Sequence, residues 1–286
     1  MALTTNELFS RIKPSQIREF DELFRSVEGC IPMTIGEPDF DMPENVKRAA
    51  IKAIEDNASH YAHTSGEIGV RKAVSEFLEK QYNLHYDPET EIVMTVGATE
   101  GLFAAAFGLL NPGDQVIIPS PYFPLYSYAV ELNRGECILV DTSDTGFLMT
   151  PELLHKTMAE NKNVKALFLN YPSNPTGATY TKDELIALAD AIKQYDIFVL
   201  SDEIYSEITY GEKHTSIATL LRDRTILFQG ASKAFAMTGW RVGVLAADAK
   251  WMKTLFLAHQ QLVTTGVTVS NRAAEEAFRN SAPDVE

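Results

Sequence analysis

The sequence predicts an α/β protein, a three-layer sandwich with a mainly parallel central sheet and an N-terminal arm. From residue 91 onward, short apolar runs alternate with amphipathic stretches, and each run is almost continuously apolar. Continuous apolar strands separated by helices are typical of a parallel sheet covered on both faces. The expected strands are residues 91–96, 115–119, 137–140, 164–170, 197–203, 225–231 and 241–247.

The expected helices follow from apolar residues at helical spacing. In the first helix, Pro43 suits an opening turn, and Val46, Ala49, Ala50 and Ala53 are expected to share one face. Residues 1–42 are expected to form an arm and a loop instead. The expected helices are residues 43–56, a segment after Gly66, and residues 99–110, 122–132, 150–160, 181–195 and 248–263.

The composition of the chain excludes several classes of function for the protein. The 286 residues are 45% hydrophobic and 22% charged, which is ordinary for a soluble enzyme. The formal net charge of −14 is repelled by nucleic-acid backbones and anionic lipids, so neither nucleic acid nor a membrane is an expected partner. The two cysteines lack the spacing of a metal site or a disulfide framework. We find no secretory signal and no run of about 18 apolar residues, so a cytoplasmic enzyme is expected. This enzyme is expected to hold no metal.

Reactive side chains follow several of the predicted strands. Lys233 follows the run TILFQGA, Asp202 and Tyr205 lie in SDEIY, and Asn174 lies in NYPSNPTG. Ligands of open α/β sheets bind beyond the carboxyl ends of the strands, where these residues are expected to meet. A lysine amine can form an imine, and the planar guanidinium of Arg241 can bind phosphate with two hydrogen bonds. The combination predicts a site for pyridoxal 5′-phosphate (PLP).

Further residues suit the same cofactor. The run GATEG joins a strand to a helix, and helix N-terminal amides favour phosphate, with Thr99 adding a hydroxyl. Ser232 and Arg241 would complete this phosphate site. Phe123, in the run PYFPLY, is placed to stack on the cofactor ring.

Each residue also has an ordinary structural explanation. Lys233 alone would be a solvated lysine. Asp202 alone would be a helix cap or an ion pair, and Tyr205 and Phe123 would be packed aromatic residues. The cofactor hypothesis therefore depends on the conjunction of these residues at strand ends.

In these motifs the chain resembles the class I/II aminotransferases, which are fold-type I PLP enzymes. The matching runs span about residues 35–247. Their sequences are most similar to those of bacterial aromatic-amino-acid and N-acetyl-diaminopimelate aminotransferases. The combination of NPTG, SDEIY and the lysine followed by GWR is specific to the family. The matching runs are IGEPDF, YAHTSGEIGVR, VGATEG, PYFPLY, NYPSNPTG, SDEIYSEITY and SKAFAMTGWRVG.

The resemblance implies a role for each matched residue. Lys233 falls on the Schiff-base lysine, and Asp202 falls on the partner of the pyridine nitrogen. Asn174 and Tyr205 fall on the ligands of the ring oxygen, and Asn174 also falls on a substrate-binding position. Lys233, Asp202 and Tyr205 are therefore the expected catalytic residues. The stacking aromatic would be Phe123, and the phosphate would be bound by Ala98, Thr99, Ser232 and Arg241.

Two more positions concern a partner subunit and the substrate. Tyr61 falls on a tyrosine that reaches the phosphate of the neighbouring subunit, which implies a homodimer with shared sites. Gly36 falls on a loop glycine near the substrate carboxylate. The family also has an arginine that binds that carboxylate, but no residue here takes its position. Arg272 and Arg279 are expected to be surface cations.

The resemblance also implies a domain arrangement. Residues 1–42 would be the arm and loop on the side of the small domain. Residues 43–247 would be the PLP-binding large domain. Residues 248–286 would be the start of a long helix towards a C-terminal small domain, which is expected to be missing or truncated in this chain.

The expected reaction is transfer of an amino group between an amino acid and a 2-oxo acid with ping-pong kinetics. Lys233 would act as the general base once an amino acid displaces it. Three alternatives remain: a PLP-dependent carbon–sulfur lyase or decarboxylase on the same scaffold, an inactive PLP-binding fragment, and a cofactor-sensing regulator. The residues leave the donor and acceptor open.

Overall fold

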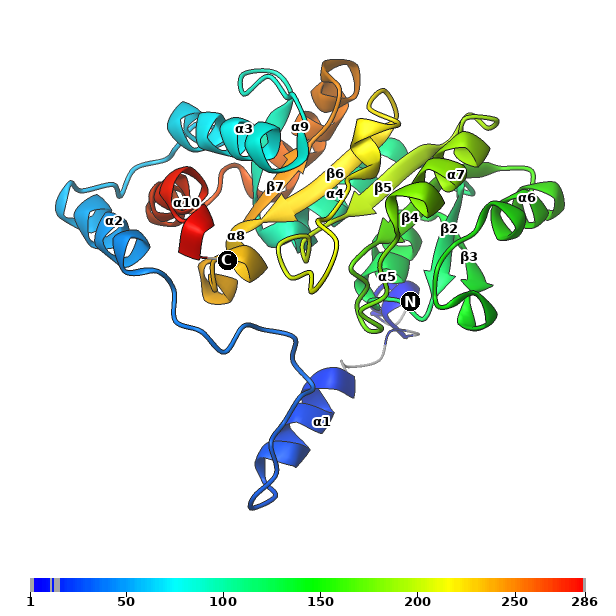
Figure 1. Cartoon of the computed structure of the whole chain (residues 1–286), viewed down its shortest axis with the longest axis horizontal. Helices are drawn as coiled ribbons and strands as arrows, with labels where there is room; N and C mark the ends of the chain where they lie inside the picture. The colour runs from blue at the N-terminus through cyan, green and yellow to red at the C-terminus, as the bar shows by residue number, and fades with distance from the viewer. Residues whose placement is uncertain (1–2, 11, 13–15, 285–286) are drawn as a thin grey trace. The chain divides into compact units, whose positions relative to one another are not determined.

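The predicted strands form one seven-stranded sheet in the computed structural model, which describes residues 3–10, 12 and 16–284. Each strand lies within two residues of its expected bounds, and the prediction of an α/β fold is confirmed (Figure 1). The order across the sheet is β1-β7-β6-β5-β4-β2-β3. The bounds are β1 Ile92–Val96, β2 Gln115–Ser120, β3 Glu136–Asp141, β4 Val164–Asn170, β5 Phe198–Asp202, β6 Thr225–Gly230 and β7 Val242–Ala246.

Strand β7 runs against the rest of the sheet. It pairs antiparallel with β1 on one side and with β6 on the other, whereas the other pairs are parallel. Its first residues therefore lie at the edge where the other strands end. Arg241, just before β7, is thereby carried to the edge where Lys233 follows β6.

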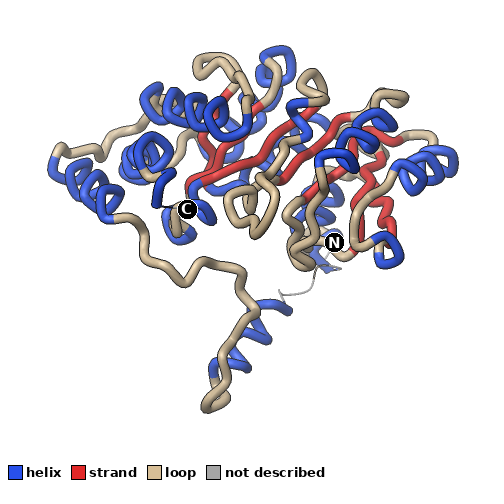
Figure 2. The backbone as a smooth tube through the Cα atoms, in the orientation of Figure 1, coloured by secondary structure: helices blue, strands red, loops and turns tan. Residues whose placement is uncertain are grey.

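The helices cover both faces of the sheet, as the three-layer prediction requires (Figure 2). Neighbouring residues of each strand enter opposite cores, for example Ile226 and Leu227 of β6. One face is covered by α4, α5 and α9, and the other by α3, α10, α6 and α7. The bounds are α2 Glu44–Glu55, α3 Ile68–Tyr82, α4 Gly97–Leu109, α5 Leu125–Leu132, α6 Pro151–Glu160, α7 Lys182–Ile192, α8 Ala231–Ala234, α9 Ala249–Val263 and α10 Thr268–Asn280.

The chain divides into two compact units, Met1–Asp39 and Phe40–Glu286. Within the first unit, helix α1 (Gln16–Arg25) forms where the sequence analysis expected only an arm and a loop. Ile17, Phe20 and Phe24 lie one helical turn apart and make an apolar stripe, a signal that the analysis missed. Residues 1, 2, 11 and 13–15 of the predicted arm lie outside the described residues, as do residues 285 and 286.

The helix expected at residues 248–263 is α9, and a second helix, α10, follows it in the segment that was expected to be the start of one long helix. The chain leaves α9 through Thr264, whose φ is 61°, and bends at Thr264 and Thr265 before α10 begins. Helix α10 then packs against α2 and α3 through small residues such as Ala273 and Ala277. In the part of the chain that the structure describes, every helix is too short or too polar to cross a membrane.

Candidate active site

Most of the predicted site residues lie at one edge of the sheet. Asp202 is the last residue of β5, and Lys233 lies in α8 directly after β6. Asn174 belongs to the turn after β4, and Arg241 precedes β7. Ala98 and Thr99 lie in the first turn of α4, which follows β1. The structure thus brings together residues from five strand ends.

Asp202 is a buried carboxylate with two hydrogen-bond donors. Its side chain is 4% exposed. Tyr126 Oη donates to Oδ2 at 2.8 Å, and the Ile204 amide donates to Oδ1 at 3.2 Å. Burial raises the pKa of Asp202 to about 6, while these bonds and the charge of Lys233 pull it down. A carboxylate that is largely ionised at neutral pH in an apolar site suits a cationic N–H partner.

Lys233 lies close to the same carboxylate. Its Nζ atom is 5.4 Å from the centre of the Tyr205 ring, and its charge acts on Asp202. Burial and the charge of Asp202 raise the pKa of Tyr205, so its hydroxyl keeps its proton. The amine, the carboxylate and the phenol therefore form one cluster, as predicted.

The Asn174 turn is held by Asn170, which the sequence analysis did not single out. Asn170 Oδ1 accepts a hydrogen bond of 2.6 Å from the Asn174 amide, and Asn170 Nδ2 donates to the Asp202 carbonyl at 2.9 Å. Asn174 Nδ2 donates to Tyr205 Oη at 3.5 Å. Asn170 thus ties the end of β4 to the end of β5 and presents Asn174 beside Tyr205.

Glu203 fixes the turn that follows Asp202. It is completely buried and accepts hydrogen bonds from Ser201 at 2.7 Å, Ser216 at 2.9 Å and Tyr171 at 3.2 Å. His214 Nε2 lies 2.8 Å from its other oxygen. The turn between Asp202 and Tyr205 is therefore held from behind by a buried polar network.

A cradle for an anion lies where α4 meets β7. Gly97 has a left-handed φ of 71°, and its amide donates to the Arg241 carbonyl at 3.0 Å. A Cβ atom on Gly97 would collide with the Arg241 guanidinium, and one on Gly243 would collide with the backbone of Gly97 and Ala98. The first turn of α4 carries amides without partners in the helix. Small residues thus allow a guanidinium and helix amides to converge, which fits a phosphate.

Ser232 and Phe123 complete the predicted set. Ser232 is 6% exposed and immediately precedes Lys233 in α8. The Phe123 ring packs edge-on against Tyr126, with centroids 5.7 Å apart and an interplanar angle of 81°. Packing on Tyr126 is the role that the structure shows for Phe123, and its stacking on a cofactor stays a prediction.

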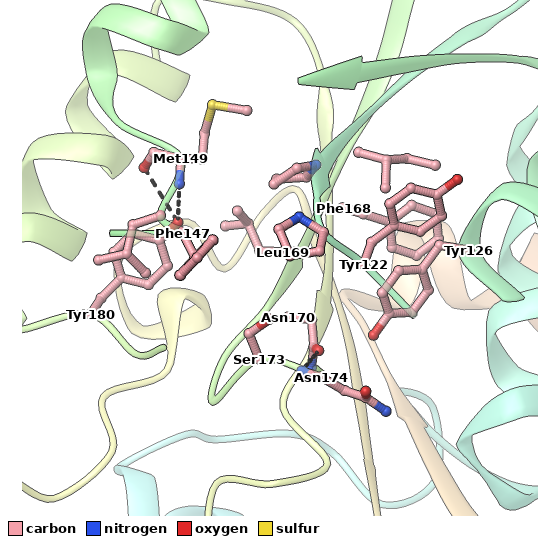
Figure 3. A pocket seen from close by; sticks show the side chains of 14 residues that line it. Tyr122, Tyr126, Phe147, Met149, Phe168, Leu169, Asn170, Ser173, Asn174 and Tyr180 are labelled. Carbon is pink, nitrogen blue, oxygen red and sulfur yellow. Dashed lines mark hydrogen bonds between the residues drawn. The ribbon is translucent and has the colours of Figure 1, made fainter. Parts of the chain in front are cut away.

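A small hollow of about 20 Å³ lies between Tyr126 and the Asn174 turn (Figure 3). Tyr122, Tyr126 and Phe168 line one side, and Asn170 and Asn174 line the lower edge. Tyr126, the partner of Asp202, was missed by the sequence analysis. Its spacing of three residues from Phe123, one helical turn, was the available signal.

The remaining predicted positions are Tyr61 and Gly36, together with the surface arginines Arg272 and Arg279. Tyr61 is 89% exposed and borders a surface hollow formed with residues 265–268. Gly36 belongs to the first unit, whereas the other predicted site residues belong to the second. Arg272 and Arg279 make surface ion pairs with Glu67 and Glu275, as expected of surface cations.

A lysine amine, a buried carboxylate and an anion cradle meet at this edge of the sheet, a combination that can hold a phosphorylated, carbonyl-bearing ligand. Comparison with known protein families identifies the family to which the chain belongs. Residues 28–284 match the model of the family "Aminotransferase class I and II", and the chain belongs to this family, whose members use PLP.

Individual relatives agree with the family. A probable N-acetyl-LL-diaminopimelate aminotransferase of Bacillus subtilis is 42% identical over 96% of this chain and 69% of its own length. The aromatic-amino-acid aminotransferase 2 of Thermococcus litoralis is 37% identical over 97% of this chain and 72% of its own. The structure of Thermus thermophilus aspartate aminotransferase with maleate superimposes with a TM-score of 0.91 at 35% identity, covering 98% of this chain and 74% of that one.

Proposed function

We propose that this chain acts as a PLP-dependent aminotransferase that moves an amino group between an amino acid and a 2-oxo acid. The observation that supports this most is the cluster of Lys233, Asp202 and Tyr205 beside the cradle of Gly97 and Arg241. In this proposal, residues 43–247 are the PLP-binding large domain, and two chains form a homodimer.

The described residues fit each part of the cofactor. Arg241, Ser232, Thr99 and the first amides of α4 would hold the phosphate, and Asp202 would accept a hydrogen bond from the pyridine nitrogen. Asn174 and Tyr205, already paired at 3.5 Å, would donate to the ring oxygen. When bound, PLP supplies an electron sink that stabilises negative charge at the amino-acid Cα.

The chain's own residues then handle the protons. The amine of Lys233 would take the α-proton from the amino acid and pass it to the cofactor carbon, and it would move a proton in the opposite direction with the second substrate. Asp202 would remain charged at pH 7, because its pKa of about 6 lies below that pH. The Tyr126 hydroxyl and the Ile204 amide would keep its oxygens oriented. Alternation between the two substrates predicts ping-pong kinetics.

The Lys233→Ala variant tests this proposal directly. After incubation with PLP and reduction with borohydride, peptide mass mapping is expected to find the cofactor on Lys233 of the parent chain and nowhere in the variant. Transamination by the variant is expected to fall by at least about a hundredfold, because the base is lost.

Lys165→Ala is the matched control. This lysine is also partly buried, but it lies on β4 with its ammonium 5.7 Å from the Phe198 ring centre. The control is expected to be labelled at Lys233 like the parent. An unlabelled Lys233 in folded parent protein, or parent-like turnover by Lys233→Ala, would contradict the proposal.

A further inference from the structure

A buried histidine joins three elements around the start of α4. His259 of α9 is completely buried, and its Nδ1 lies 3.0 Å and 3.1 Å from the two carboxylate oxygens of Glu100. Its Nε2 lies 3.0 Å from the carbonyl oxygen of Thr64. Glu100 belongs to the first turn of α4, and Thr64 belongs to the loop that carries Tyr61.

The hydrogen-bond partners determine where the protons lie. A carbonyl oxygen only accepts, so Nε2 must carry a proton. Nδ1 faces both oxygens of Glu100 almost equally, as an N–H shared between two carboxylate oxygens does. Glu100 Oε2 also accepts a hydrogen bond from the Val96 amide at 3.2 Å. Both ring nitrogens are therefore protonated, and the pair is an imidazolium and a carboxylate.

The electrostatic balance agrees with this geometry. Burial lowers the pKa of His259, but the hydrogen bond and charge of Glu100 and the Thr64 carbonyl raise it above its ordinary value. Among the described residues, Glu100 is the titratable group that acts on His259.

The pair of His259 and Glu100 stabilises the turn that forms the anion cradle. Through Val96, Glu100 ties the first turn of α4 back to the end of β1, directly beside Gly97. An uncompensated carboxylate there would repel a phosphate dianion at Ala98 and Thr99. The His259 cation offsets that charge and at the same time holds the loop of Tyr61.

We propose that His259 and Glu100 are a positioning pair for phosphate binding, an imidazolium–carboxylate bridge that holds the α4 cradle and ties the Tyr61 loop to it. This inference rests on the proposed function, because the phosphate concerned is that of PLP. Neither side chain is assigned a step in proton transfer.

Nuclear magnetic resonance of the chain without PLP tests the protonation state. A long-range ¹H–¹⁵N spectrum at pH 7.5 is expected to show both nitrogens of His259 protonated in the parent. In Glu100→Gln, which keeps the side-chain shape without the charge, the ring is expected to become neutral. A neutral His259 in the parent would overturn the proposal.

Binding of inorganic phosphate to the chain without PLP tests the consequence. His259→Gln and Glu100→Gln are each expected to weaken phosphate binding about tenfold at pH 7.5, and the double variant is expected to lose less than the two losses combined. The control is His155→Gln, whose Nδ1 lies 2.7 Å from Tyr195 Oη at the other end of the sheet. It is expected to bind phosphate like the parent.

The outcomes separate the two proposals. Parent-like phosphate binding by both variants overturns the positioning role, even if PLP labels Lys233. If the variants weaken phosphate binding in a chain whose Lys233 is not labelled by PLP, that result supports the positioning role and contradicts the aminotransferase proposal. Circular dichroism checks that each variant is folded, and Glu100→Gln carries the test if His259→Gln is not.

Discussion

Asp202 shows how a single residue can serve chemistry at the expense of stability. Its carboxylate is buried and receives two hydrogen bonds, which are too few to offset the loss of water, so its pKa rises from 3.8 to about 6. In the cofactor-free chain at neutral pH, the ionised form is therefore a source of strain that a cationic ligand would relieve.

Asp202→Asn is expected to stabilise the cofactor-free chain at high pH. Because the folded pKa is raised, the Asp202 contribution to stability is fully present below pH 3.8 and is lost as the pH rises through about 6. The rise of the Asp202 pKa from 3.8 to about 6 corresponds to about 3 kcal/mol of unfolding free energy at pH 8. Urea unfolding should therefore show the variant more stable than the parent at pH 8 and equal to it near pH 4.

The same substitution is expected to slow transamination severely while the chain still binds PLP, because a neutral amide cannot hold a charge on the pyridine nitrogen. Asp190→Asn is the control, since Asp190 is an exposed residue paired with Lys193.

Equal unfolding free energies of parent and Asp202→Asn at both pH values would contradict the assigned burial cost.

The strands could be predicted from the sequence because both faces of this sheet are buried. Each strand is an apolar run, and the turns between them break the pattern clearly. The direction of β7 could not be predicted, since an apolar run reads the same in either direction. Tyr126 and Asn170 were missed for a related reason, because their bonds to Asp202 depend on how β4, β5 and α5 are placed in space.

The turn between β1 and α4 can be tested with two glycines that share a conformation. Gly97 and Gly113 have φ of 71° and 84°, but a Cβ on Gly97 would collide with Arg241, whereas one on Gly113 would meet no atom within 4 Å. Alanine at either position is expected to cost roughly 1–2 kcal/mol in unfolding free energy.

Only Gly97→Ala is expected to weaken phosphate binding, because it displaces the Arg241 guanidinium. Isothermal titration with inorganic phosphate and urea unfolding of both variants would measure the two effects separately. Equal phosphate affinity in Gly97→Ala and Gly113→Ala would show that the close approach of Gly97 and Arg241 has no part in binding.

The proposed dimer concerns the molecule as a whole. Tyr61 turns an almost fully exposed ring to solvent beside a hollow of about 380 Å³ formed with residues 265–268. Exposed aromatic side chains are enriched at protein interfaces. The loop behind Tyr61 is held to α9 through Thr64 and His259, so the ring projects from a supported backbone.

If Tyr61 completes the site of a partner chain, two defective chains should restore each other. In a mixed dimer of Lys233→Ala and Tyr61→Phe, one site combines the intact Lys233 of one chain with the intact Tyr61 of the other, and the second site carries both defects. Random pairing should therefore give about a quarter of the parent number of intact sites. Unfolding the two variants together, refolding them and titrating with PLP would count these sites. If each chain uses its own Tyr61, mixing cannot exceed the average of the two variants measured alone, and that result would exclude shared sites.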